Sequence, residues 1–382
     1  MNSPATRLDS RDHPAKPQAM NPPFAQQVPV AELQAYVVSV FMASGLLQTD
    51  ACTLAASLVE ADLRGTHSHG VIRLPFLVDR LLQGGANPHP DIRVVNEAPG
   101  TALLDGDRAL GAITATRAME MAIEKARTQG IGFVTARNSD FIGTCAHYAM
   151  KALPHDMIGI AWTNGFPGMA PWGGRSNTIG NNPIAFAAPS RSHGPIVLDM
   201  ALSVAAGGRI RLAAKNGEKI PPDWLVDRDG QPTDDPQALA AGGALLPLGY
   251  KGYGLAVFGE ILCGVLTGSR ILGEIPAWFK DTGSAVGNGH LHIAIDIARF
   301  VEPDTFKLRM DGLVSLVKAT PLMPEVREIL LPGERAWRIQ QAQQISGIPV
   351  SEPVAADLLA LARRLGVTAP ASLHSSSPDC TP

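Results

Sequence analysis

The segment RGTHSHGVIR, residues 64–73, holds the densest group of side chains suited to chemistry. It places two arginines, two histidines and a serine within ten positions, in a stretch that we expect to be a loop between two helices. Reduction of a carbonyl group needs a proton donor of near-neutral pKa, which histidine supplies, and a cation that holds the substrate carboxylate, which arginine does with two parallel hydrogen bonds. His69 and Arg73 meet these two needs. A helix connection whose histidines cap backbone groups explains the same pattern equally well.

The histidines also permit a metal-site interpretation. His67 and His69 form one His-x-His pair, and His290 and His292 form a second on an expected strand, where alternate residues face the same side. Four imidazoles would suit zinc or copper. Since neither a cysteine nor a carboxylate stands nearby at a ligand spacing, we expect no metal. A metal-dependent hydrolase remains a remote alternative.

Two further segments offer groups suited to a nucleotide. Residues 170–189 combine glycines, asparagines and prolines, and asparagine amides can pair with a carboxamide such as that of nicotinamide. Asp199 ends the apolar segment PIVLDM, where a carboxylate can bind a ribose hydroxyl or orient a histidine. From composition alone, a surface loop and a helix cap are the simpler interpretations of these two segments.

The common nucleotide-binding and hydrolase motifs are missing from the sequence. It contains no G-x-G-x-x-G, no G-x-x-x-x-G-K-[ST], no G-x-S-x-G and no H-E-x-x-H. The nearest glycine-rich element is GYKGYG, residues 249–254, from which Lys251 could reach a phosphate. Its spacing does not match the turn of a Rossmann fold.

Hydrophobic periodicity predicts a layered α/β fold in which helices alternate with short apolar strands. We expect helices over 30–46, 50–63, 75–83, 109–128, 144–152, 253–266, 304–318 and 353–365. We expect strands over 131–136, 157–163, 184–189, 195–200 and 290–296. The last helix is amphipathic and is expected to pack with the N-terminal helices.

Composition limits the possible partners and surroundings. The 382 residues carry a formal net charge of −3, so the chain offers no strong basic field for a nucleic acid. The four cysteines lie far apart without a CxxC pair, which fits a reducing cytoplasm. No apolar run reaches the length of a membrane helix, and the N-terminal residues do not resemble a secretory signal.

Several long segments, in the same order along the chain, resemble the malate/L-lactate dehydrogenase-like family, which is unrelated in fold to the Rossmann lactate dehydrogenases. The resemblance runs from about residue 30 to 367. It rests on ADLRGTHSHGVIRLP (61–75), APWGG (170–174), GNNPIAFAAP (180–189), LDMALS (198–203), IPPDWLVDRDGQPTDDP (220–236), LLPLGYKGYGL (245–255) and LPGERAW (331–337).

The resemblance implies an NAD(P)-dependent enzyme that transfers hydride between the cofactor, NAD or NADP, and C2 of a small 2-oxo acid, 2-hydroxy acid or cyclic imino acid. It also implies a homodimer, and a non-Rossmann α/β domain beside helices from both chain ends. We accordingly divide the chain into a disordered tail (1–27), a helical N-terminal part (28–102), an α/β cofactor- and substrate-binding domain (103–318), C-terminal helices packed on the N-terminal part (319–368) and a second disordered tail (369–382).

By motif position, the resemblance also assigns roles to residues. Ser68 and His69 match the active-site Ser-His-Gly, and Arg73 matches the arginine that binds the substrate carboxylate. The positions that match cofactor contacts are Asn164, Asn182, Pro183, Asp199, Met200, Ala201 and Lys251.

Three positions depart from the family pattern. Phe141, in NSDFIG, stands where members have a histidine that accepts a proton in some of them. Asn181 replaces a threonine, and Gly208-Arg209 replaces Gly-Lys with its charge kept. A phenyl ring carries no proton, so His69 acts alone, the substrate differs, or the chain is an inactive or repurposed relative that still binds the nucleotide. His147, six residues further on, is not expected to substitute for the missing histidine.

Overall fold

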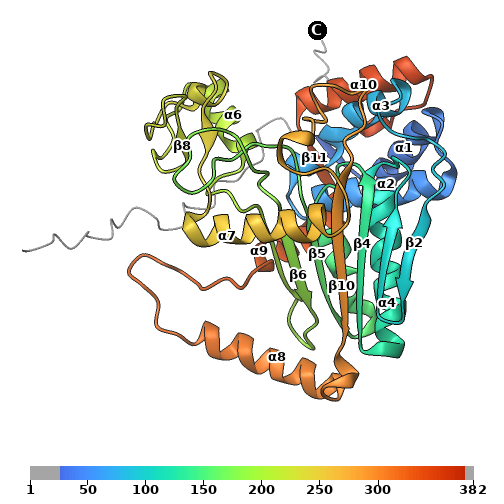
Figure 1. The fold of residues 1–382 in the computed structure, drawn as a ribbon, viewed down its shortest axis with the longest axis vertical. Coiled ribbons are helices and arrows are strands. Elements are labelled where there is room, and N and C mark those ends of the chain that lie inside the picture. Colours follow the sequence, from blue (N-terminus) through green and yellow to red (C-terminus); the bar gives the residue numbers. More distant parts are fainter. Residues whose placement is uncertain (1–25, 375–382) are drawn as a thin grey trace, which may run out of the picture.

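The computed structural model describes residues 26–374, in which a mixed sheet of seven strands is covered by helices (Figure 1). The sheet strands are β2 (Arg93–Ala98), β3 (Thr101–Asp105), β4 (Ile131–Ser139), β5 (Met157–Thr163), β6 (Ile184–Ala188), β7 (Ile196–Met200) and β10 (Asn288–Asp296). Their spatial order is β2-β3-β4-β10-β5-β6-β7, and only β3 and β4 run parallel to each other. The expected non-Rossmann mixed α/β fold is thus confirmed.

The helices have the following bounds: α1 (Val30–Ala43), α2 (Gln48–Leu63), α3 (Leu74–Leu82), α4 (Gly111–Gln129), α5 (Cys145–Met150), α6 (Gly207–Asn216), α7 (Gly249–Gly259), α8 (Pro303–Lys318), α9 (Glu334–Ser346) and α10 (Glu352–Leu365). A π-helical turn, Glu260–Val265, continues α7. Within residues 26–374 no helix has both the length and the apolar composition needed to cross a membrane.

The two faces of the sheet bury different helices because alternate residues of a strand point to opposite sides. On β10, Ala294 belongs to the larger apolar core, which includes residues of α4 and α5. Leu291 and Ile293 point the other way and pack in a second core with Ala256 of α7 and with Cys263. The segments that follow β4, β5 and β7 begin the loops of Phe141, Asn164 and Ala201, whereas the loop 64–73 comes from the helical layer, between α2 and α3.

Both ends of the chain meet in one helical layer, seen at the upper right of Figure 1. The short strands β1 (Gln26–Val28) and β11 (Ile348–Val350) pair in antiparallel fashion. The Tyr36 hydroxyl of α1 donates a hydrogen bond of 2.6 Å to the carbonyl oxygen of Leu358 in α10. The last helix, α10, thus contacts the N-terminal helix α1 in this layer.

Most of the two expected tails lies outside the described residues. Within residues 26–374, however, Gln26 and Gln27 belong to β1, and Ala371–Leu373 forms a 3-10 turn. These two parts are ordered because the ladder to β11 and the burial of Leu373 hold them against the helical layer.

Candidate active site

The loop between α2 and α3 is shaped by a buried carboxylate. Asp62, near the end of α2, accepts a hydrogen bond of 2.7 Å from the backbone N–H of Val71 and lies 2.9 Å from Nδ1 of His67. A Cβ atom at Gly70 would come within 2.1 Å of that carboxylate, so only glycine fits there. The sequence analysis did not single out Asp62, although a carboxylate on the apolar side of an amphipathic helix was a visible signal.

The fixed loop brings Ser68, His69 and Arg73 together. Ser68 Oγ lies 2.8 Å from His69 Nδ1, and Arg73 Nε donates a hydrogen bond of 2.6 Å to the Ser68 carbonyl oxygen. Because Nδ1 of His69 is paired with the Ser68 hydroxyl, Nε2 is left available for a proton. The two terminal nitrogens of Arg73 likewise make no hydrogen bond within the described residues, so they can hold a carboxylate.

The surroundings of His69 favour its neutral form. Burial, assisted by the positive charge of Arg73, lowers the pKa of His69 to about 4. At neutral pH the imidazole can therefore accept a proton. A negative charge beside Arg73 would offset the positive charge that contributes to lowering the pKa of His69.

Phe141 lies directly against the candidate catalytic histidine. Its ring centroid is 5.9 Å from that of His69, with an angle of 27° between the planes. The Phe141 ring also stacks on Trp278, with 4.4 Å between the ring centroids and an angle of 23° between the ring planes. The guanidinium carbon of Arg73 lies 5.4 Å from the Trp278 ring centroid. An aromatic surface thus connects the side chains of His69 and Arg73.

His147 does not take the place of the missing histidine at this surface. Its side chain is buried, and its Nδ1 lies 2.5 Å from Oε2 of Glu60 on α2. Nε2 of His147 is buried and has no hydrogen-bond partner within residues 26–374. No ring contact or hydrogen bond of the described residues joins His147 to His69.

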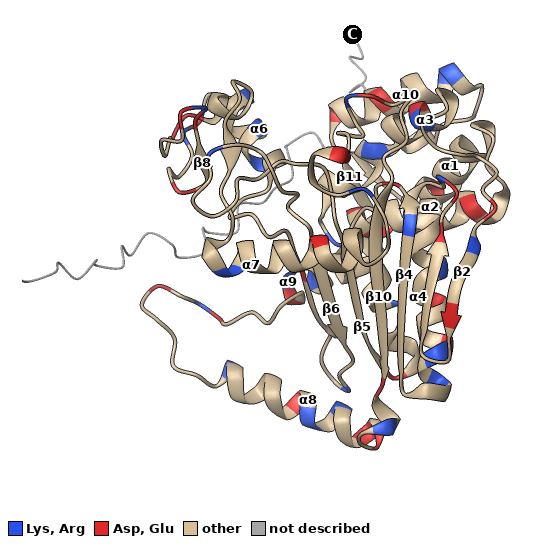
Figure 2. Ribbon diagram, viewed as in Figure 1, with Lys and Arg blue, Asp and Glu red and all other residues tan. Residues whose placement is uncertain are grey.

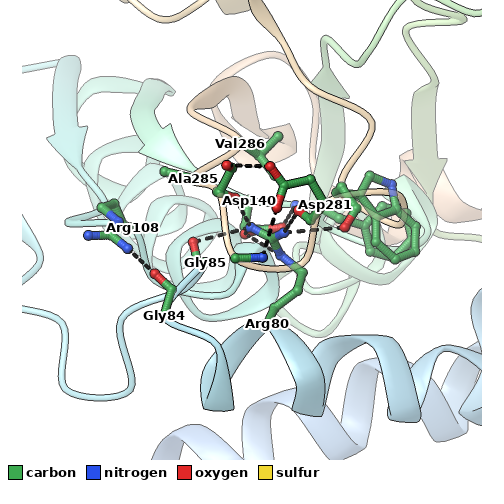
Figure 3. A network of polar contacts seen from close by, with 12 residues as sticks. Arg80, Gly84, Gly85, Arg108, Asp140, Asp281, Ala285 and Val286 are labelled. Carbon is green, nitrogen blue, oxygen red and sulfur yellow. Dashed lines mark hydrogen bonds and ion pairs between the residues drawn. The ribbon is translucent and has the colours of Figure 1, made fainter.

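A completely buried arginine lies at the centre of a network of polar contacts beside the aromatic surface (Figure 3). Arg80 of α3 donates to Oδ2 of Asp140 from Nε at 2.9 Å and from Nη2 at 2.6 Å. It also donates to four backbone carbonyl oxygens, those of Gly85, Trp278, Asp281 and Ser284. The sequence analysis missed Arg80, although its place among the apolar residues of the helix 75–83 was a visible signal.

Glu260 connects two of the predicted cofactor residues. Asn164 Nδ2 donates to Oε2 of Glu260 at 3.2 Å, and Asn182 Nδ2 donates to Oε1 at 3.0 Å. The side-chain oxygen of Asn164 accepts a hydrogen bond from the backbone N–H of Gly289, and that of Asn182 accepts one from the backbone N–H of Gly165. Both asparagine side chains are therefore fully engaged inside the protein, and any contact with a ligand would come from their backbone or from adjacent residues.

Asp199 stands at the end of β7 next to the start of α5. Its Oδ2 accepts a hydrogen bond of 3.2 Å from the backbone N–H of Ala146, and the residue remains exposed. Desolvation by the neighbouring protein raises the pKa of Asp199 to about 6, while the backbone hydrogen bond and the charge of Arg64 oppose the rise. Since Arg64 directly precedes the loop of His69, the Asp199 region adjoins the candidate catalytic loop.

The remaining predicted cofactor residues lie on both sides of Asp199 and on α7. Met200 ends β7, and Ala201 follows it. The Pro183 carbonyl oxygen accepts hydrogen bonds from the Thr163 backbone and from the Cys145 thiol. Lys251, in the first turn of α7, is exposed, and its charge makes no ion pair within the described part of the chain.

The two His-x-His pairs do not come together as a metal site. His290 and His292 are completely buried on β10, and burial lowers their pKa values, that of His290 to about 3. His67 and His69 instead contact Asp62 and Ser68. Among residues 26–374 no group of three or more histidines, cysteines or carboxylates is arranged to hold a metal.

Comparison with known proteins assigns this architecture to a family. The family model of malate/L-lactate dehydrogenase matches residues 28–359. Malate dehydrogenase of Pyrococcus horikoshii is 39% identical over 350 residues, which are 89% of this chain and 96% of that protein. Its solved structure superposes with a TM-score of 0.85 at 36% identity, covering 92% of this chain and 99% of the other.

Two further relatives act on other substrates. The NAD(+) ureidoglycolate dehydrogenase of Escherichia coli is 32% identical over 81% of this chain and 88% of its own length. A pyrroline-2-carboxylate and piperideine-2-carboxylate reductase of Pseudomonas putida is 33% identical over 85% of this chain and 94% of its own length. The chain belongs to the malate/L-lactate dehydrogenase family of dehydrogenases and reductases.

Proposed function

We propose that this protein transfers hydride between NAD or NADP and C2 of a small 2-oxo acid, 2-hydroxy acid or cyclic imino acid. The observation that carries the proposal is the arrangement of His69, Ser68 and Arg73 on a loop fixed by Asp62. Arg73 offers two free terminal nitrogens for a carboxylate, and His69 offers Nε2 for a proton. The relatives that act on 2-hydroxy acids and imino acids support this substrate class.

The residues present suit a nicotinamide cofactor in their donor chemistry. The exposed carboxylate of Asp199 can accept hydrogen bonds from ribose hydroxyls, and the unpaired cation of Lys251 at the start of α7 suits a phosphate. Met200 and Ala201 would line the same edge, and Asn164, Asn182 and Pro183 would shape the backbone near it. When bound, the nicotinamide would supply a hydride to C2 of the substrate or accept one from it.

The chain's own residues then perform the binding and the proton transfer. Arg73 orients the substrate through its carboxylate, so that C2 and its oxygen or nitrogen lie near His69. Nε2 of His69 takes the proton from a 2-hydroxy acid during oxidation and returns it during reduction. Ser68 holds the imidazole through Nδ1 and so fixes the direction in which Nε2 points.

The surroundings of the protein belong to the same proposal. We propose a homodimer in the cytoplasm, without a nucleic acid or membrane partner. The dimer is supported by exposed apolar side chains along α7 and α8, among them Phe258 (59% exposed) and Leu316 (77% exposed). The reducing compartment is supported by the wide separation of the cysteines in the sequence.

The experiment follows absorbance at 340 nm with purified protein, NADH or NADPH, and a panel of 2-oxo acids and cyclic imino acids. We expect oxidation with one class, and we expect His69→Ala to lower turnover by at least about 100-fold with cofactor binding intact. His155→Ala, which removes an exposed histidine, serves as the control. Normal turnover in His69→Ala would exclude the assigned role.

A second candidate function follows from Phe141. Because this residue carries no proton, a family member that binds the nucleotide without turnover is the alternative. It predicts cofactor affinity, measured by quenching of protein fluorescence, and no oxidation of NADH or NADPH with any member of the panel.

A further inference from the structure

Three aromatic side chains lie in space between the side chains of His69 and Arg73. We call them the aromatic wall and define it as Phe76, Phe141 and Trp278. Phe141 stacks on Trp278, and Phe76 makes a T-shaped contact with Trp278 at a centroid distance of 6.1 Å and an angle of 85° between the ring planes. His69 lies against one end of the wall, and the Arg73 guanidinium lies over Trp278. Phe76 is 37% exposed and Phe141 is half-buried, so these two rings present the accessible apolar surface, whereas Trp278 is only 6% exposed and supports them from inside the protein.

The wall is rigidly held, as a surface that selects a ligand must be. The Asp140 carboxylate, which Arg80 holds, also accepts a hydrogen bond of 2.6 Å from the backbone N–H of Phe141. The same guanidinium donates to the Trp278 carbonyl oxygen. Arg80 thereby fixes the end of β4 and the segment 278–284 relative to each other, and with them the two stacked rings.

We infer that the aromatic wall receives the substrate's side chain, and that this enzyme prefers 2-oxo acids with a bulky apolar side chain. The inference deepens the proposed function and rests on it. A substrate whose carboxylate is held by Arg73 and whose C2 faces His69 must place its remaining substituent beside the surface that connects the two. On this chain that surface is aromatic, which favours apolar groups and excludes a second carboxylate, for which it offers no partner.

A competing feature is Arg211 of α6, an exposed cation near Arg73. Two neighbouring cations would suit a substrate with two negative charges. However, Arg211 makes no hydrogen bond or ion pair that would hold it in place within residues 26–374, whereas both stacked rings are fixed by Arg80 and Asp140. The preorganised wall is therefore expected to decide the preference, and a dianionic substrate is the result that would overturn the inference.

The test compares kcat/KM of the full chain at 340 nm for pyruvate, 2-oxo-4-methylpentanoate, 2-oxo-4-phenylbutanoate and oxaloacetate. We expect the phenyl substrate to exceed oxaloacetate by at least about 10-fold. Phe141→Leu and Trp278→Leu are expected to lower the ratio of kcat/KM for the phenyl substrate to kcat/KM for pyruvate about 5- to 10-fold. Phe300→Leu, at a residue that is 71% exposed, is the matched control.

Each outcome separates this inference from the proposed function. Preference for oxaloacetate, lost in Arg211→Gln, overturns the aromatic selection and leaves the dehydrogenase standing. An equal loss for pyruvate and the phenyl substrate in Phe141→Leu also overturns it, because the wall would then not distinguish side chains. If only the cyclic imino acids of the panel are reduced, the inference fails and the proposed function stands. If neither these nor any acid of the series is reduced, both fail.

Discussion

His69 is the one histidine of the candidate site whose imidazole faces both a hydroxyl and an aromatic ring. By the family resemblance, members usually carry a histidine at the position of Phe141, and its charge would couple to that of His69. Here the phenyl ring of Phe141 adds only apolar surface, so burial and Arg73 determine the protonation of His69. With phenylalanine in place of histidine at position 141, the titration of His69 is not coupled to that of a second histidine at this position.

We therefore predict that the His69 imidazole titrates near pH 4 in the free protein. Burial disfavours the imidazolium and so favours the neutral form, which takes up a proton only when the pH falls through about 4. The measurement is an NMR titration of the histidine side chains between pH 3.5 and 8, with His69→Ala used to assign the resonance. A midpoint near 6.5 would contradict the burial of His69.

The lowered pKa of His69 also makes the free energy of unfolding depend on pH. The folded protein holds His69 with a pKa of about 4, whereas an unfolded chain has the ordinary value of about 6.5. Between these two values the unfolded state binds more protons, so this contribution to the free energy of unfolding is present above pH 6.5 and is lost as the pH falls toward 4.

At the scale of elements, Arg80 and Asp140 join α3, β4 and the segment 278–284 into one unit (Figure 3). Both side chains are almost completely inaccessible. Removal of one partner leaves the other charge buried without compensation, which is much more costly than exchange of the whole pair for apolar groups.

We predict that Arg80→Met lowers the free energy of unfolding by about 3–5 kcal/mol, measured by urea denaturation. Asp140→Asn keeps the shape and an acceptor oxygen but leaves the Arg80 charge buried without a counter-ion, so a loss of about 3–5 kcal/mol is expected as well. The double variant Arg80→Met/Asp140→Leu should recover part of the loss of Arg80→Met, because neither charge remains buried. If the double variant is less stable than both single variants, the pair does not act as a coupled unit.

Elements with a strong apolar period could be predicted from the sequence. The helix expected over 304–318 is α8 (303–318), and the strands expected over 157–163 and 290–296 are β5 and β10. The strand β2 was missed because all six of its residues are exposed, so no alternation of burial marks it. The helix α9 was missed because its segment ERAWRIQQAQQIS has few apolar residues and only Gln343 is buried.

The candidate site was predictable only in part, for a similar reason. Ser68, His69 and Arg73 lie within six positions, so their proximity follows from the sequence itself. Trp278 lies more than 130 residues beyond Phe141, in the segment that precedes β10. Only the pairing of β10 with β4 brings the two rings together. Such long-range juxtapositions leave no local pattern in a single sequence.

At the scale of the whole molecule, two long elements expose apolar side chains. On α7 and its π-helical continuation, Leu255, Phe258 and Ile261 recur at intervals of three and remain 43–59% exposed. Helix α8 lies apart from the sheet at the bottom of Figure 1 and exposes Leu313 and Leu316. Figure 2 shows few charged residues along α7, as expected of a surface that is covered in the assembled protein.

We predict that the chain forms a dimer through these two helices, with twice the chain mass of 40.3 kDa in sedimentation equilibrium. Phe258→Glu and Leu316→Glu place a charge in the apolar contact, so we expect each variant to shift the equilibrium toward the monomer and to make the thermal midpoint depend more strongly on protein concentration. Met42→Glu, at a position on α1 that is 45% exposed, should leave the dimer intact. A wild-type mass near that of one chain, or dimers unaffected by both charged variants, would show that α7 and α8 stay exposed for another reason.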